Sequence, residues 1–317
     1  MLEPLSGRPS PVTPEVCLVC GSAQLAILYP QAEDYLTGDG FQVWQCQHCG
    51  TGFTFPQKAD LSRYYPSRYR QYTPFIVNIL KGLYRRKVHL WIRDFTAPGR
   101  VFEMGCGSGF MLDTLRQAGW QVVGSERSPE ALTYARQTLG LNVFVGAPNA
   151  LSGAVFDLVI LFQVLEHLHN PVETLAQIRR LLKPGGKVVI GVPNLHSWQA
   201  AFGRDRWFHL DVPRHLFHFS PDALRIALEK AGLQVETIRY NSFEHDPYGW
   251  VQTGFNRLDP VFNRLTRFLM RIDRTTGRSL VQLVVAFPVG IIAGILTVFS
   301  WIFKRGAIME ITARRLE

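Results

Sequence analysis

The stretch "VFEMGCGSGF", residues 101–110, decides the fold. An apolar strand pattern ends in three alternating glycines, Gly105, Gly107 and Gly109, and a helix pattern follows. Glycine permits positive φ and lets a ligand approach bare backbone, and the first turn of a helix offers unpaired N–H groups. The stretch therefore predicts a strand, a ligand-binding loop and a helix in direct succession.

Two acids near this loop indicate the kind of ligand. Glu103 precedes the loop within the strand, and Glu126 ends the next predicted strand. A carboxylate at Glu103 repels a pyrophosphate but suits a cationic amino group, and an acid at Glu126 suits both ribose hydroxyls. Phe110 stands where a dinucleotide fingerprint has its third glycine. A cationic, ribose-bearing ligand without phosphates is S-adenosylmethionine.

Outward from the loop, apolar strand patterns alternate with helix patterns of 10–15 residues. This alternation predicts an α/β fold with a doubly wound, Rossmann-like sheet of parallel strands. The predicted strands are 100–105, 121–126, 141–146, 156–163, 187–193, 233–240 and, near the end, 307–315. The predicted helices are 110–119, 128–140, 171–186 and 220–232.

Taken together, these motifs resemble the class I S-adenosylmethionine-dependent methyltransferases, in the broad group that contains the ubiquinone-pathway O-methyltransferases. The resemblance covers roughly residues 95–240 and the closing strand. It rests on "FEMGCGSG", "VVGSERSP", "FDLVILFQVLEHLHNP", "LLKPGGKVVIGVPN" and "PRHLFHFSPDALRIALEKAG". It implies a seven-stranded sheet and an enzyme that transfers a methyl group from S-adenosylmethionine.

The resemblance also implies which residues bind the cofactor. Glu103 and the glycine backbone are expected to face the methionine part, Glu126 the ribose, and Asp157 and Gln163 the sulfonium end. The acid that often contacts the adenine is replaced by Ala147, and Asn149 is the candidate substitute. The expected cofactor-binding residues are Glu103, Gly105, Cys106, Gly107, Gly109, Glu126, Arg127, Asn149, Asp157 and Gln163.

Histidines near the predicted methyl position are candidates for a general base, because their pKa lies near neutrality. His167 follows the fourth strand of the sheet, next to Glu166, and His215 lies in "WFHLDVPRHLFHFS", after the fifth strand. Both are predicted as catalytic residues. The alternative is a structural role, in which Glu166 supports the site and His215 and His218 hold a lid shut through hydrogen bonds.

Four cysteines form two C-x2-C-G motifs, a pattern typical of a zinc ribbon. Two such turns point four thiolates at one ion, and four sulfurs in a tetrahedron suit Zn²⁺ in a structural role. The alternatives are a redox pair or free thiols. The predicted ligands are Cys17, Cys20, Cys46 and Cys49.

The unbroken apolar run from Leu280 to Phe303 is long enough to span a bilayer once. Upstream, residues 258–278 predict a basic amphipathic helix that lies on an anionic membrane. Pro288 and Gly290 divide the run, and both of its flanks are basic. We therefore expect a helical hairpin that enters the membrane from the cytoplasmic face and returns. The alternative for the basic segment is a core-packed helix with a solvated basic face. The alternatives for the apolar run are a hairpin buried against a second copy in a homodimer and a single span.

The charge distribution and the N-terminal sequence indicate the compartment and the partners. Of the net charge of +9, residues 256–317 carry +6, from ten Lys/Arg and four Asp/Glu, so the remainder carries +3. This distribution favours a membrane surface over nucleic acid. The N-terminal sequence does not resemble a signal peptide, which predicts a reducing, cytoplasmic environment.

These patterns predict an enzyme that methylates a lipid-linked or amphiphilic acceptor at the cytoplasmic face of a membrane. Three alternatives stay open: a soluble nucleotide-sugar or polysaccharide methyltransferase in the cytoplasm, a nucleic-acid methyltransferase, and a non-catalytic scaffold. The expected organisation is a loose N-terminus (1–14), a zinc ribbon (15–56), a connector (57–90), a methyltransferase domain (91–255 with 307–317) and a membrane anchor (256–306).

Overall fold

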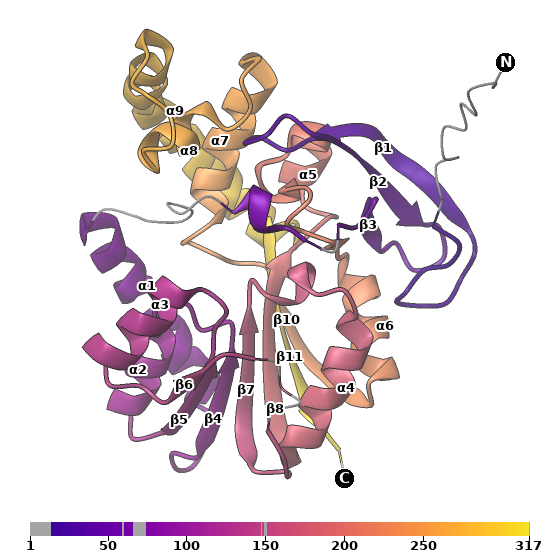
Figure 1. Ribbon diagram of the computed structural model, residues 1–317, viewed down its shortest axis with the longest axis vertical. Helices are drawn as coiled ribbons and strands as arrows, with labels where there is room; N and C mark the ends of the chain where they lie inside the picture. Colours follow the sequence, from indigo (N-terminus) through magenta and orange to yellow (C-terminus); the bar gives the residue numbers. More distant parts are fainter. Residues whose placement is uncertain (1–13, 59, 66–73, 147, 149–150, 317) are drawn as a thin grey trace, which may run out of the picture.

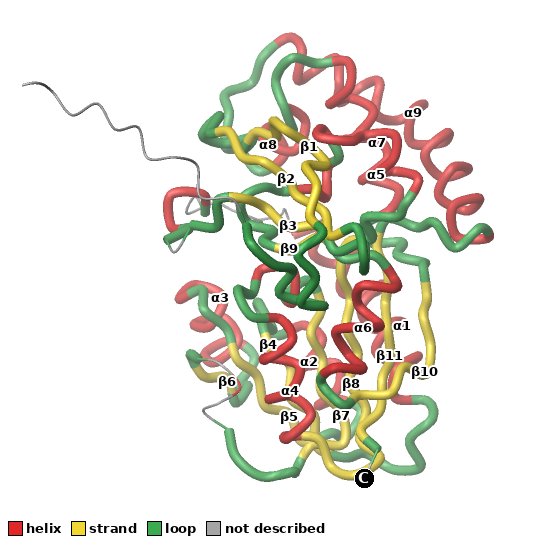
Figure 2. Tube along the Cα trace, turned by 90° about the vertical axis from the view of Figure 1, so that its right-hand side faces the viewer, coloured by secondary structure: helices red, strands yellow, loops and turns green. Residues whose placement is uncertain are grey.

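The computed structural model describes residues 14–58, 60–65, 74–146, 148 and 151–316. Figure 1 shows a large sheet in the lower part of the molecule, with a small sheet at the upper right and a group of helices at the upper left. Figure 2, turned by 90°, shows the same separation of sheet and upper helices.

The large sheet has seven strands in the order β10-β11-β8-β7-β4-β5-β6. Strands β4, β5, β6, β7 and β8 are mutually parallel, whereas β11 pairs antiparallel with both β8 and β10. The order reverses at β4, and such switch points place ligands at the carboxyl ends of the strands. The strands are β4 (Arg100–Met104), β5 (Gln121–Ser125), β6 (Val143–Phe144), β7 (Phe156–Phe162), β8 (Leu182–Pro193), β10 (Leu233–Arg239) and β11 (Ile308–Arg315). The predicted Rossmann-like sheet is confirmed.

Helices cover both faces of this sheet, which explains why its central strands are apolar throughout. Along β7, Leu158 and Ile160 pack with helices α1 and α2, whereas Val159 and Leu161 pack with α4 and α6. The helices of this domain are α1 (Pro74–Ile92), α2 (Phe110–Gln117), α3 (Pro129–Thr133) with its π-helical continuation η2 (Tyr134–Thr138), α4 (Pro171–Leu181) and α6 (Pro221–Lys230), with the 3-10 turns η1 (Ser62–Tyr64) and η4 (Leu165–His167).

The small sheet contains the cysteine motifs and is called the ribbon below, residues 17–55. Its strands β1 (Leu25–Glu33), β2 (Gly40–Cys46) and β3 (Gly52–Phe55) form antiparallel hairpins. A fourth strand, β9 (Phe217–His218), pairs antiparallel with β3. It belongs to residues 207–220, a distant part of the chain that is called the lid below. The ribbon is therefore joined to the methyltransferase part through a shared sheet.

The upper helices come from two segments of the chain, one between β8 and β9 and the other between β10 and β11. They are α5 (Trp198–Gly203), α7 (Asp246–Leu258), α8 (Arg264–Leu269) and α9 (Gly277–Ile302), with 3-10 turns η5 (Arg204–Arg206) and η6 (Phe208–Leu210). The predicted basic helix over 258–278 is wrong as a single element. Pro260 follows the end of α7, and Asn263 adopts a left-handed φ of 54° before α8 begins.

The prediction of a hairpin within the apolar run is also wrong, because α9 is one continuous helix of 26 residues that contains Pro288. A proline inside a helix removes one N–H donor, and here the helix continues past it. Among the described residues, α9 is the helix that is long and apolar enough to cross a bilayer, judged by length and composition.

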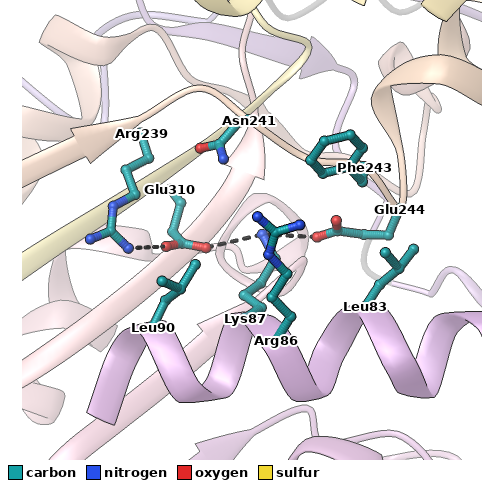
Figure 3. Close-up of a pocket in the computed structure, with 9 residues that line it drawn as sticks. All are labelled: Leu83, Arg86, Lys87, Leu90, Arg239, Asn241, Phe243, Glu244 and Glu310. Atoms are coloured by element: carbon teal, nitrogen blue, oxygen red, sulfur yellow. Dashed lines mark hydrogen bonds and ion pairs between the residues drawn. The ribbon is translucent and has the colours of Figure 1, made fainter. Parts of the chain in front are cut away.

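A buried ion network fixes helix α1 to the end of the sheet. Figure 3 shows Lys87 of α1 between Glu244 and Glu310, with Nζ–Oε distances of 2.9 and 3.1 Å. Trp91 Nε1 also donates to Glu310 at 2.8 Å. Because both carboxylates already contact the buried ammonium, we assign this pocket a structural role. Its lining residues are Leu83, Arg86, Lys87, Leu90, Arg239, Asn241, Phe243, Glu244 and Glu310.

Candidate active site

The glycine loop lies at the carboxyl end of β4, as predicted. Gly105, Gly107 and Gly109 have φ values of 69°, 53° and 81°, a region that L side chains rarely adopt. A Cβ on Gly105 would approach Val164 to 2.5 Å, so the loop packs against the segment that follows β7. A Cβ on Gly107 would meet no atom within 4 Å. The loop therefore leaves open space above Gly107, where a ligand can lie against the backbone.

Glu126 turns its carboxylate toward this loop from the end of β5. Its Oε2 accepts a hydrogen bond from the Gly107 amide at 2.8 Å. Its Oε1 accepts from the amides of Arg127 and Ser128 at 2.6 and 2.7 Å. These bonds hold Glu126 beside the glycine backbone, in the place expected for an acid that binds ribose hydroxyls. Arg127 is exposed and contributes its amide to this arrangement.

Glu103 and Gln163 place polar atoms toward the same edge of the sheet from β4 and β7. Burial, and to a smaller extent the charge of Glu126, raises the pKa of Glu103 to about 8. Within the described residues, Glu103 Oε2 and Gln163 Nε2 are buried and have no hydrogen-bond partner. Gln163 also adopts a φ of 58°, which is rare outside glycine. Buried polar atoms normally have partners, so these two suit a polar ligand.

Cys106 is buried between the loop and β5, and its Sγ would be 3.0 Å from a Cβ added to Gly124. Burial raises the pKa of its thiol. Its position fixes the loop, and its backbone is the part available to a ligand.

The prediction that Asp157 lies at the sulfonium end is wrong. Asp157 is the second residue of β7, at the amino end of the parallel strands. There its Oδ2 accepts from the Arg100 amide at 2.8 Å, and Lys183 Nζ lies 2.8 Å from its Oδ1. Residues Asp157 and Gln163 are six apart in a strand, so they lie at opposite edges of the sheet. Asn149 lies outside the described residues.

The two predicted catalytic histidines lie together. The ring centroids of His167 and His215 are 4.7 Å apart, with an interplanar angle of 70°. Glu166 is fully buried beside them, and polar side-chain atoms of the three residues lie within 4.8 Å of one another. His167 ends the 3-10 turn η4, which follows Val164, the residue that packs against Gly105 of the glycine loop.

His218 has a different environment, which supports the structural alternative for this residue. Its ring is buried, its Nε2 lies 3.0 Å from Thr54 Oγ1 of the ribbon, and burial lowers its pKa to about 3. No sequence pattern marks Thr54 or Asp34 as a site residue. Both lie in the ribbon and contact the lid, and only the pairing of β3 with β9 brings these segments together.

The four predicted zinc ligands converge at one end of the ribbon. The Sγ atoms of Cys17, Cys20, Cys46 and Cys49 all lie within 4.8 Å of one another. The Cys17–Cys49 and Cys20–Cys46 Sγ distances are 3.7 and 3.5 Å. A tetrahedral Zn²⁺ with Zn–S bonds of about 2.3 Å needs sulfurs separated by about 3.8 Å. The geometry fits such an ion.

An open glycine loop, a buried acid with a raised pKa and a second acid at the next strand define a class I S-adenosylmethionine-dependent methyltransferase. Comparison with known proteins agrees. A family model described as "Methyltransferase domain" matches residues 77–238, just over half of the chain. The chain belongs to this methyltransferase family.

Curated relatives share the same part of the chain. A protein named ubiquinone biosynthesis O-methyltransferase, from Cereibacter sphaeroides, is 29% identical over 176 residues, which cover 50% of this chain and 70% of the relative. A protein of the same name from Xanthomonas oryzae pv. oryzae is 30% identical over 159 residues, covering 45% of this chain and 65% of the relative.

Solved structures with similar folds include a SAM-dependent methyltransferase from Archaeoglobus fulgidus, with a TM-score of 0.49 and 18% identity, covering 74% of this chain and 94% of that one. Another is the putative methyltransferase crystallised with the Haloferax volcanii Trm112 activator, with a TM-score of 0.49 and 18% identity, covering 77% of this chain and 94% of that one.

Proposed function

We propose that this methyltransferase acts on a lipid-linked or amphiphilic acceptor at the cytoplasmic face of a membrane, to which helix α9 attaches it. The observation that carries the proposal is the outer face of α9. Large apolar side chains on this face are exposed, among them Phe287 at 80%, Val284 at 73% and Ile302 at 66%. Soluble monomers rarely expose a contiguous apolar surface of this extent.

The distribution of residues around α9 is the reverse of that in a soluble amphipathic helix. The side chains it buries are small or polar: Ser279, Gln282, Ala293, Thr297 and Ser300. Most of the leucines, valines, isoleucines and phenylalanines are exposed instead, although Val289 packs against the cluster formed with α7. A helix with this pattern is stable when a second apolar medium covers its outer face, and a bilayer supplies such a medium.

Contacts along most of its length support an orientation of α9 in the plane of the proposed membrane. Near its start, Gln282 Nε2 donates to Asp259 Oδ2 at 2.8 Å. In its middle, Ala293 packs with Val251 and Phe255 of α7. At its end, Trp301 donates to Asp246 of α7. A helix attached to the protein at three levels leaves one side, rather than its whole circumference, for lipid. This orientation replaces the predicted hairpin.

The route from this face to the histidine pair is short. Helix α7 lies directly beneath α9, and its Thr253 accepts from the amide of Phe208 in η6 at 3.2 Å. The carbonyl of the next residue, His209, is 2.9 Å from Nδ1 of His215. Helix α7 therefore lies between α9 and the lid that carries His215, an arrangement that suits an acceptor with an apolar tail.

The named activity of the curated relatives supports an oxygen atom as the acceptor. S-adenosylmethionine supplies the activated methyl group, and a hydroxyl acceptor also needs a base to remove its proton. We assign the cofactor to Glu103, Gln163, Glu126 and the backbone of residues 105–109, and the general base to His167 or His215. A homodimer through α9 is the alternative occupant of the apolar face.

The ribbon is proposed to hold one structural Zn²⁺ through Cys17, Cys20, Cys46 and Cys49. Four thiolates leave no open coordination position, so the ion supplies folding energy rather than chemistry.

The test is transfer of radiolabel from S-adenosylmethionine in a cell lysate, followed by separation into organic, aqueous small-molecule and macromolecular fractions. We expect label in the organic fraction, and none when Gly107 is replaced by a residue that fills the loop (Gly107→Asp). Label in the aqueous fraction alone would replace the lipid acceptor by a soluble sugar or nucleotide. Label in RNA or DNA would make the protein a nucleic-acid methyltransferase.

A further inference from the structure

The segment that carries His215 is held by the ribbon as well as by the methyltransferase domain. Strand β9 pairs with β3 of the ribbon through Gly52–His218 and Phe53–Phe217. The amide of Thr54 donates to the carbonyl of Leu216 at 3.0 Å. On the other side, the amide of Leu216 donates to the carbonyl of Glu166 at 2.8 Å. The lid is therefore clamped between the ribbon and the turn that bears His167.

Arg214, next to His215, is anchored in the ribbon by its side chain. Its Nη2 lies 2.7 Å from Asp34 Oδ1, and both side chains are fully buried. Its Nη1 donates to the carbonyl of Tyr64 at 2.8 Å, and its Nε donates to Asp211 at 2.8 Å. The guanidinium also lies 4.5 Å from the ring centroid of Tyr35. A fully buried cation is tolerated with such partners and is strongly destabilising without them.

The backbone of Arg214 sets the protonation of His167. The carbonyl oxygen of Arg214 lies 2.8 Å from His167 Nδ1. Because a carbonyl only accepts, Nδ1 of the neutral ring carries the hydrogen, and Nε2 is the basic nitrogen. His215 is arranged in the same way, since its Nδ1 lies 2.9 Å from the carbonyl of His209. Asp211 Oδ2 lies 3.8 Å from His215 Nε2.

Thr54 of the ribbon completes this arrangement. Its hydroxyl donates to the carbonyl of His215 at 2.6 Å. Its oxygen, 3.0 Å from His218 Nε2, then accepts the hydrogen of that neutral ring. One hydroxyl of the ribbon thus fixes the backbone of His215 and the orientation of His218 together.

We propose that the ribbon holds His167 and His215 in the Nδ1–H tautomer, with Nε2 as the basic nitrogen. Asp34 acts through Arg214, which is a positioning residue, and Thr54 acts on the carbonyl of His215. This inference rests on the proposed function for the role of the histidine pair, and its geometry does not depend on the acceptor. The four cysteines connect to the same path, because Thr51 Oγ1 lies 3.0 Å from Cys49 Sγ and Thr51 precedes β3. The ribbon then contributes directly to the structure of the active site.

The test compares full-length, metal-loaded variants by ¹⁵N spectra of labelled histidines, by affinity for S-adenosylhomocysteine, and by turnover. Thr54→Val removes the hydroxyl at nearly constant volume, and Asp34→Asn removes the charge that faces Arg214. Thr54→Ser is the conservative variant that retains the hydroxyl. Glu33→Gln is the matched control, because Glu33 is the neighbouring, exposed carboxylate of the same hairpin.

We expect the wild type and Glu33→Gln to show the Nδ1–H tautomer for His167 and His215. Thr54→Val and Asp34→Asn should give mixed tautomers and a turnover about tenfold to a hundredfold lower, with S-adenosylhomocysteine affinity within about twofold of wild type. Thr54→Ser should restore the wild-type spectrum. Chelation of the ribbon metal should reproduce the spectrum of Thr54→Val, a readout that does not require turnover.

Unchanged tautomers in both Thr54→Val and Asp34→Asn would overturn the inference. So would a loss of turnover matched by an equal loss of cofactor affinity, because that result describes general destabilisation. If Asp34→Asn does not fold, Thr54→Val alone decides, since it leaves the buried ion pair intact. The tautomers are measured without an acceptor, so failure of the lipid-acceptor proposal remains distinguishable from failure of this one.

Discussion

Strand β7 and helix α9 are both strongly apolar, yet they have opposite environments. Every residue of β7 from Leu158 to Leu161 is fully buried, because helices cover both faces of the sheet. In α9 the large side chains are exposed, and the small ones face the protein. The difference teaches that apolar composition marks a need for an apolar environment without saying which one. For β7 the chain itself supplies that environment, and for α9 we propose that a membrane does.

The largest expected effect separates the two segments directly. Ile160→Asp places an unpaired carboxylate in the middle of the sheet, which should remove a large share of the roughly 5–15 kcal/mol of a domain's stability. Phe287→Asp places the same group on the outer face of α9 and should change the free energy of unfolding by less than about 0.5 kcal/mol. Urea unfolding of both variants in mild detergent measures this contrast. A similar loss for Phe287→Asp would show that protein, such as a second copy, covers α9.

A second pair tests which side of α9 faces the protein. Ala293 is buried against α7, whereas its neighbour Ile292 is 59% exposed. Ala293→Leu should destabilise the fold by about 1–3 kcal/mol through overpacking. Ile292→Ala should leave stability within about 0.5 kcal/mol, because it removes an exposed side chain. The same urea titration is the measurement, and equal effects from the two changes would contradict the inverted orientation of the helix.

The number of protons released when the cofactor binds tests the role of Glu103, at the carboxyl end of β4. The pKa of Glu103 is raised from 4.5 to about 8 in the ligand-free protein. Its stabilising contribution is therefore complete below about pH 4.5 and is lost as the pH rises through 8. If the ammonium group of the cofactor binds the ionised acid, binding at pH 6.5 should release about one proton, and affinity should rise almost tenfold between pH 6 and 7.

Calorimetry of S-adenosylhomocysteine binding in two buffers with different ionisation enthalpies measures that release. Glu103→Gln should abolish the buffer dependence and flatten the change of stability with pH. Equal binding heats in both buffers for the wild-type protein would mean that Glu103 does not pair with the ligand.

The sequence also predicts the structure better for the sheet that contains β7 than for helix α9. Most strand and helix patterns of residues 100–240 meet a partner that the chain supplies, so local pattern and final structure agree, as Ile160 in β7 illustrates. An exception is residues 182–186, predicted as the end of a helix and found in strand β8. The glycine spacing also placed Gly105, Gly107 and Gly109 correctly, because their positive φ values depend on local geometry. In contrast, Pro288 was interpreted as a break, although loss of one N–H does not interrupt a helix that is supported along its length by α7.

The errors and omissions in the site also have physical reasons. The predicted strand 156–163 already places Asp157 at its amino end, whereas ligands bind at the carboxyl ends. The assignment of Asp157 to the cofactor rests on the resemblance alone and conflicts with the strand direction. The contacts of Asp34 with Arg214 and of Thr54 with His215 join residues that are more than 150 positions apart. No local pattern marks such pairs, since each depends on how the ribbon docks against the lid.

The smallest expected effects come from the two ends of β7. Gln163→Ala removes a buried amide at the carboxyl end and should lower S-adenosylhomocysteine affinity about threefold to tenfold, the effect of one hydrogen bond. Asp157→Asn acts at the amino end and should leave that affinity within about twofold, with a slight loss of thermal stability from the weakened contact with Lys183. Titration calorimetry compares them. An equal loss of affinity for both variants would show that Asp157 contributes to cofactor binding.

The central claim, that the outer face of α9 is a membrane surface, is tested most directly by flotation with vesicles of anionic phospholipid. The full chain is compared with a variant in which Phe287, Ile291 and Ile295, which lie four residues apart on one exposed face, are all replaced by Asp. The account predicts that the wild-type protein floats with the vesicles, and that the folded variant remains in the dense fraction. A wild-type protein that stays with the soluble fraction, or a variant that floats as well as the wild type, would contradict it.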